Sequence, residues 1–183
     1  MTKPRTLKTS IETAESDGGP IVSSAHLVSE RAAELSEFEF GLIIANNAFQ
    51  RWMVRCMTTS GIPDLSPLDI LVLHTVNHRG RAKKLADICL VLNVEEAHTV
   101  TYALRKLAKL DLVDSQRKRK ENSFSITPEG KALCERYREI REKCLVKSFC
   151  TLHHADDKLS DLAGLLRALS GIYDQAARAA TSL

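Results

Sequence analysis

The fold of the chain can be read from residues 82–126, which run AKKLADICLVLNVEEAHTVTYALRKLAKLDLVDSQRKRKENSFSI. Apolar residues recur at helical spacing over residues 82–91 and again over residues 95–110, so both stretches are predicted to be helices. Only Leu92-Asn93-Val94 separates them, and Asn tolerates the left-handed backbone of a tight turn between helices. The pattern therefore predicts a helix-turn-helix.

A basic hairpin is predicted to follow. Residues 112–115 and 123–126 alternate apolar and polar side chains, as the strands of a half-buried hairpin do. The expected tip, residues 116–122, contains four consecutive cations: Arg117, Lys118, Arg119 and Lys120. Thr127-Pro128 then begins a capped helix that is expected to reach about residue 152. A helix-turn-helix, a hairpin and a capped helix in this order indicate a winged helix.

Helices are predicted on both sides of this unit. A Ser-x-x-Glu pattern at Ser36 and Glu39 predicts a capped helix over residues 36–60, and Ser66-Pro67 predicts the start of the next one. The first helix has too many apolar residues for one buried stripe, and leucines of the last helix recur at intervals of three and four residues. We therefore expect a homodimer, with an interface that includes Phe40, Ile44, Leu162, Leu166, Leu169 and Tyr173.

The expected fold is mainly α with a small β-hairpin wing, in which dimerisation helices flank a winged helix-turn-helix. The predicted parts are a tail over residues 1–22, an N-terminal arm and dimerisation helix over 23–60, the winged helix-turn-helix over 61–127, and C-terminal dimerisation helices over 128–183. A chain of 183 residues with 44% apolar and 27% charged residues is long enough to form one hydrophobic core.

The charge distribution favours nucleic acid as the partner. The chain has a net charge of only +3, but residues 79–120 hold eleven basic and five acidic residues, a net +6 that leaves −3 for the remainder. The sequence lacks an apolar run long enough to cross a membrane and lacks a secretory signal, so we expect a cytoplasmic protein without a membrane partner. Five cysteines at wide spacing, without a C-x-x-C pair, are typical of free thiols.

The second helix of the helix-turn-helix has a polar face opposite its apolar stripe. In a helix-turn-helix this face enters the major groove of DNA, with its first residues closest to the bases. The candidates for base contact are His98, Thr99, Thr101, Tyr102 and Arg105. The candidates for phosphate contact are Lys83, Lys84, Lys109, Arg117, Lys118, Arg119 and Lys120.

Three segments resemble the MarR family of bacterial transcriptional regulators, named for multiple antibiotic resistance. They are IPDLSPLDILVLHTV (62–76), TVTYALRKLAKLDLV (99–113) and SITPEG (125–130). The resemblance implies a homodimer that binds double-stranded operator DNA, usually as a repressor, with a pocket for a small-molecule effector between dimer helices and winged domain. The chain departs from the family at Asn93, where Gly is common, and at residues 117–120, which replace the Asp-x-Arg motif of the wing.

Other functions remain open at this stage. A winged helix can instead be a protein-interaction module whose basic face binds an acidic partner. A metal or thiol sensor would use His74 and His78, or the cluster Cys150, His153, His154, Asp156 and Asp157, but neither group forms a complete ligand set. Cys56 and Cys89 occupy inward positions where a thiol is inert, and no catalytic motif is present, so we expect neither an enzyme nor a bound metal or cofactor.

Overall fold

The structure is a computed structural model that describes residues 33–118, 121–149 and 155–183. The chain divides into two units, residues 1–50 and 51–183, and the boundary lies within helix α1 (Ala33–Thr59). In the first unit the described residues, 33–50, are all helical. The predicted helix over 36–60 is confirmed, but the predicted cap is wrong, because Ser36 lies inside α1 instead of at its start.

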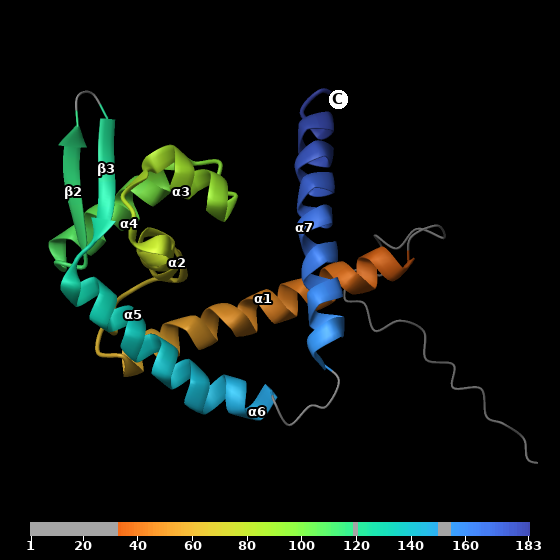
Figure 1. Cartoon of the computed structure of the whole chain (residues 1–183). Coiled ribbons are helices and arrows are strands. Elements are labelled where there is room, and N and C mark those ends of the chain that lie inside the picture. Colours follow the sequence, from red (N-terminus) through yellow and green to blue (C-terminus); the bar gives the residue numbers. More distant parts are fainter. Residues whose placement is uncertain (1–32, 119–120, 150–154) are drawn as a thin grey trace, which may run out of the picture. The chain divides into compact units, whose positions relative to one another are not determined.

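The second unit contains the winged helix (Figure 1). After α1 come α2 (Pro67–Asn77), a 3₁₀ turn (His78–Gly80), β1 (Lys83–Lys84), α3 (Leu85–Leu92), α4 (Ala97–Lys109), β2 (Val113–Lys118), β3 (Glu121–Ile126) and α5 (Pro128–Arg141). A π-helical turn (Glu142–Val146) and α6 (Lys147–Phe149) extend α5, and α7 is Ala155–Ala180. The described chain is mainly helical with a small antiparallel sheet, as predicted.

The start of α2 and the turn of the helix-turn-helix follow from local sequence. The Ser66 hydroxyl accepts a hydrogen bond from the backbone N–H of Asp69 at 3.2 Å, and the Asp69 carboxylate accepts one from the N–H of Ser66 at 2.8 Å. Asn93 ends α3 with φ 51° and ψ 44°, the left-handed conformation that the sequence predicts for it. The helix-turn-helix is therefore confirmed as α3 and α4.

The sheet differs from the prediction in two respects. Its order is β1-β3-β2, and β1 occupies residues that were expected to begin a helix, with Lys83 paired to Phe124 and Lys84 to Ser123. Arg79 and Gly80, in the 3₁₀ turn after α2, have left-handed backbone conformations, and the chain that follows is extended and pairs with the free edge of β3. The hairpin strands are also longer than predicted, since Gln116, Arg117 and Lys118 pair within β2 instead of forming the tip.

One hydrophobic core connects the helices and strands of the winged helix with the end of α1. It joins the end of α1 to α2, α3, α4, β2 and α5; among its fully buried side chains are Met57, Ile70, Leu73, Ile88, Leu104, Leu107, Leu112 and Leu133. Leu110 is 41% exposed because α4 ends at Lys109, one residue before the end of the predicted helix. Leu112, just before β2, is buried in the core. This core fixes α4 by one side and leaves its opposite side in solvent.

The C-terminal part of the unit is helical. Thr127 caps α5, and the helical path continues through the π-helical turn to Phe149, while the rest of the predicted helix lies outside the described residues. On α7, Leu159, Leu162, Leu165, Leu166 and Ile172 are exposed. In the part of the chain that the structure describes, no helix is long and apolar enough to cross a membrane.

Candidate nucleic-acid interface

Helix α4 has an exposed polar face, and its opposite face is packed against the hydrophobic core. Val100, Ala103, Leu104 and Leu107 are buried with at most 1% exposure, so one side of the helix is fixed to the core. On the other side Tyr102 is 72% exposed, and His98, Arg105 and Lys109 are also exposed. A tyrosine ring in solvent loses the benefit of burial, and such a residue is common where a ligand or partner later covers it.

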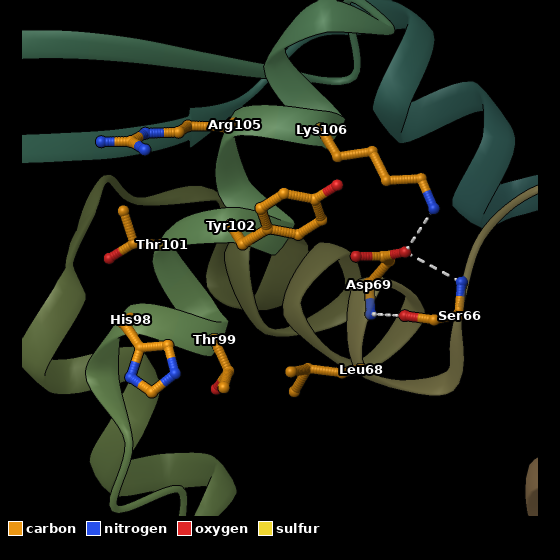
Figure 2. Close-up of a pocket in the computed structure, with 9 residues that line it drawn as sticks. All are labelled: Ser66, Leu68, Asp69, His98, Thr99, Thr101, Tyr102, Arg105 and Lys106. Atoms are coloured by element: carbon orange, nitrogen blue, oxygen red, sulfur yellow. Dashed lines mark hydrogen bonds and ion pairs between the residues drawn. The ribbon is translucent and has the colours of Figure 1, made fainter.

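The predicted base-contact residues lie together on this helix. Figure 2 shows them beside an open hollow of about 590 Å³ between α4 and the start of α2, lined by Ser66, Leu68, Asp69, His98, Thr99, Thr101, Tyr102, Arg105 and Lys106. A second hollow follows on α4, lined by Tyr102, Arg105, Lys106, Ala108 and Lys109. Tyr102 and Arg105 line both hollows. A molecule that occupies either hollow would therefore contact these two residues.

The hydrogen bonds of the polar face determine what it can offer. The hydroxyls of Thr99 and Thr101 donate to the backbone carbonyls of Glu96 and Ala97, at 2.8 and 2.9 Å, and so keep their acceptor lone pairs for another partner. Nε2 of His98 lies 3.5 Å from the carboxylate of Glu96, in a pair whose two side chains are both mostly exposed. Such a surface pair contributes little to stability.

The wing supplies cations at a fixed register. Arg117 pairs with Asn122 across the hairpin, and its side chain is exposed. Lys118 pairs with Glu121 in the backbone ladder. Arg119 and Lys120, the other two predicted phosphate contacts of the wing, lie outside the described residues. The β2–β3 hairpin projects beyond the neighbouring helices (Figure 1), and the outer end of β2 contains the basic residues Arg117 and Lys118.

The prediction that Lys83 contacts phosphate is wrong. Its side chain is buried, and Nζ donates to the carbonyl oxygens of Val76 at 3.2 Å, His78 at 2.5 Å and Arg81 at 3.3 Å. Burial, together with the positive charges of Arg81 and Arg79, lowers the pKa of Lys83. The ammonium closes the C-terminal end of α2 instead of facing solvent. The neighbouring Lys84 is exposed and remains a candidate.

Sequence reasoning missed a second structural lysine, Lys106. Its Nζ lies 2.8 Å from the carboxylate of Asp69 in α2, and the Asp69 side chain is 5% exposed. The signal in the sequence is weak. Position 106 follows Arg105 on α4 and precedes the buried Leu107, so it lies at the border between polar face and core, where a long side chain can reach a neighbouring helix.

The other candidate sites give no metal centre among the described residues. His74 packs against Tyr137, and Cys150, His153 and His154 lie outside the described part of the chain. Cys56 is buried, its thiol donates to the carbonyl oxygen of Tyr137 at 3.5 Å, and burial raises its pKa. Burial also raises the pKa of Cys134 to about 11. Both thiols are therefore protonated at neutral pH and poor nucleophiles.

Comparison with known proteins shows which family and which solved structures the chain resembles. Residues 65–130 match the family of winged helix DNA-binding domains. No curated protein matches the sequence of the chain significantly.

Similar solved structures include a MarR family regulator from Neisseria meningitidis, with 22% identity and a TM-score of 0.61 over 78% of this chain and 95% of that one. AbfR of Staphylococcus epidermidis has 18% identity and a TM-score of 0.64 over 79% and 97% of the two chains. Reduced AbfR bound to DNA has 19% identity and a TM-score of 0.62 over 77% and 97%. The chain thus contains a winged helix DNA-binding domain and has the fold of the MarR family regulators.

Proposed function

We propose that this protein is a transcriptional regulator that binds a specific double-stranded operator through α4 and the wing. The observation that carries the proposal is the polar face of α4, which is fixed by a buried apolar stripe and exposed along its length beside two open hollows. A rigid helix with an exposed polar face is the element that a helix-turn-helix inserts into the major groove. The match to winged helix DNA-binding domains supports the same function.

The residues divide into two roles. His98, Thr99, Thr101, Tyr102 and Arg105 contact base edges, because they lie on the first turns of the polar face; Arg105 offers a bidentate donor, and the two threonines offer acceptors. Lys84, Lys109, Arg117, Lys118, Arg119 and Lys120 contact phosphates and hold the protein on the duplex in a sequence-independent way.

The regulator acts as a homodimer on two half-sites. The exposed leucines of α7, including Leu162 and Leu166, form an apolar surface that is open to solvent in the single chain. A second copy would cover it, and a dimer with twofold symmetry binds a pseudo-palindromic operator. Binding over a promoter would make the protein a repressor, and a small-molecule effector would act by changing the distance between the two recognition helices.

Selection of bound fragments from random genomic DNA, followed by sequencing and gel-shift titration, tests the proposal. We expect one pseudo-palindromic sequence, bound at least about a thousandfold more tightly than unrelated DNA. Transcription from a promoter that carries this sequence should fall when the protein is added, and a screen for compounds that release the DNA would identify an effector. Equal affinity for all fragments would contradict a specific regulator and favour a module that binds an acidic protein partner through the same basic face.

A further inference from the structure

The ion pair between Lys106 and Asp69 joins the recognition helix to α2. Nζ of Lys106 donates to the Asp69 carboxylate at 2.8 Å and also to the backbone carbonyl oxygen of Asp64. Figure 2 shows the side chain of Lys106 running toward α2, whereas that of Arg105 points in the opposite direction. Two adjacent cations of α4 thus have different surroundings, one occupied by the protein and one facing solvent.

Asp69 is held from two sides. Its side chain is 5% exposed, and the carboxylate oxygen that accepts from Lys106 also accepts from the backbone N–H of Ser66 at 2.8 Å. A carboxylate with so little access to water requires compensating donors, and removing one of them leaves a buried charge without its partner. The pair therefore persists in the folded chain and fixes the distance between α4 and the start of α2.

The other end of α2 is held in the same manner. Lys83, which precedes α3, donates to the carbonyl oxygens of Val76, His78 and Arg81. Two lysines, one before α3 and one on α4, therefore each hold one end of α2. Of the two, Lys106 lies on α4 itself, next to Arg105 and one turn after Tyr102, so that its attachment fixes the rotation of the polar face.

We propose that Lys106 and Asp69 are positioning residues for sequence recognition: their ion pair sets the orientation in which α4 presents Tyr102 and Arg105 to the bases, although neither residue contacts DNA. This proposal rests on the proposed function. It assigns to Lys106 a role different from that of a phosphate contact, which its place on the recognition helix would otherwise suggest. It also makes an acidic residue of α2 a determinant of DNA selectivity.

The substitution Asp69→Asn separates a positioning role of Asp69 from a simple effect of its negative charge on DNA binding. It removes a negative charge beside the proposed DNA surface, so an effect of charge alone would tighten binding to every sequence. Asn keeps an oxygen that can accept from the N–H of Ser66, but it loses the charge that holds Lys106. If the pair positions α4, Asp69→Asn instead lowers the preference for the selected site.

The experiment compares the full chain with Asp69→Asn, Lys106→Gln, the double variant, Lys106→Arg and the matched control Lys109→Gln, whose lysine is exposed on the same helix. Dissociation constants are measured for the selected duplex and for a scrambled duplex over a range of salt concentrations. Circular dichroism at the assay temperature confirms that each variant is folded.

The selectivity ratio is the dissociation constant for the scrambled duplex divided by that for the selected duplex. We expect this ratio to fall about tenfold or more in Asp69→Asn and in Lys106→Gln, as after the loss of a base contact, and to fall no further in the double variant. Lys106→Arg should restore most of the ratio, because a guanidinium also pairs with a carboxylate. The salt slope should stay unchanged in Lys106→Gln, whereas Lys109→Gln should reduce it by about one unit and keep the ratio.

The proposal is overturned if Lys106→Gln reduces the salt slope and keeps the selectivity ratio, or if Asp69→Asn binds all sequences more tightly with the ratio unchanged. If Asp69→Asn does not fold, the comparison of Lys106→Gln with Lys106→Arg decides alone. Failure of the proposed function would look different, because the unmodified protein would then bind the selected and scrambled duplexes equally.

Discussion

The imidazole of His74 packs against the phenol ring of Tyr137, with the ring centroids 4.7 Å apart and the planes inclined at 64°. His74 belongs to α2 and Tyr137 to α5, so the contact joins the winged domain to the helix that leaves it. Nε2 of His74 is buried without a hydrogen-bond partner among the described residues. Burial disfavours the charged imidazolium and lowers the pKa of His74 below its ordinary value of 6.5.

This environment predicts a loss of stability in weak acid. The pKa of His74 is lower in the folded chain than in the unfolded one, so below about pH 6.5 the unfolded chain binds the proton first. The contribution of this histidine to the free energy of unfolding is fully present above that pH and falls as pH decreases toward the folded pKa. Urea titrations between pH 7.5 and pH 5 would measure it.

The variant His74→Phe separates this residue from other titrating groups. Phe keeps an edge contact with Tyr137 but binds no proton, so the fall in the free energy of unfolding between pH 7 and pH 5 should become smaller. His78→Gln, a change at an exposed histidine, is the matched control and should keep the slope of the unmodified protein. An identical pH dependence in His74→Phe and the unmodified protein would show that His74 is not the group responsible.

Gly130 is predicted to be irreplaceable at the start of α5. A Cβ atom there would overlap the backbone carbonyl oxygen of Leu112 and lie 2.8 Å from Cδ1 of Ile126, both at the base of the wing. Gly130→Ala should therefore lower the free energy of unfolding by about 1 to 3 kcal/mol, as overpacking does. Gly171→Ala on α7 has open space around it and should be neutral or stabilising, as for Gly→Ala in other helices. Thermal unfolding of both variants makes the comparison.

Features with a local cause could be predicted from the sequence. The caps at Ser66 and Thr127 and the left-handed Asn93 depend on side chains within three residues of the backbone they affect, and all three are as expected. Ser36 carries the same local signal, yet α1 already begins at Ala33. A capping pattern permits a helix start, but helical residues before it can override it.

Features that depend on distant partners could not be predicted. Lys106 and Asp69 are 37 positions apart, and β1 is only two residues long, with paired residues on β3 that lie 41 and 39 positions away. A count of basic residues cannot separate Lys83, whose ammonium is used within the fold, from the exposed Lys84 beside it. The sequence thus indicates which region forms the proposed DNA surface, whereas the structure is needed to identify the cations that are used within the fold and to exclude them from that surface.

The different roles of these two lysines can be tested directly. Lys83→Met removes the donor shared by three backbone carbonyl oxygens, and the loss of the buried hydrogen bond to the carbonyl oxygen of Val76 alone costs about 1 to 3 kcal/mol. The free energy of unfolding should therefore fall, while the salt dependence of DNA binding stays as it is. Lys84→Gln should have the reverse effect, a lower salt slope with little change in stability. Equal effects of both variants on DNA affinity would contradict the assignment of Lys83.

Dimerisation is predicted to depend on α7. The double substitution Leu166→Glu and Leu169→Glu places two charges on the apolar surface of α7. If a second copy covers this surface, burying the charges would weaken the dimer by several kcal/mol. Light scattering should give twice the chain mass for the unmodified protein and a smaller mass for the double variant, with weaker DNA binding because two half-sites are no longer bound together. A monomeric unmodified protein at micromolar concentration would contradict the prediction, as would a double variant that stays dimeric.

The proposed base and phosphate contacts predict opposite changes in DNA binding. Arg105→Ala or Tyr102→Ala should weaken binding to the preferred site by about 1 to 3 kcal/mol and reduce the preference for it, because both side chains project from the exposed face of α4. Arg117→Gln should weaken binding to all sequences alike and lower the salt slope by about one unit, since its exposed guanidinium lies on the wing strand. Binding isotherms on preferred and scrambled duplexes at several salt concentrations measure both effects. The two roles would have to be exchanged if Arg117→Gln changed the preferred sequence while the α4 variants changed only the salt slope.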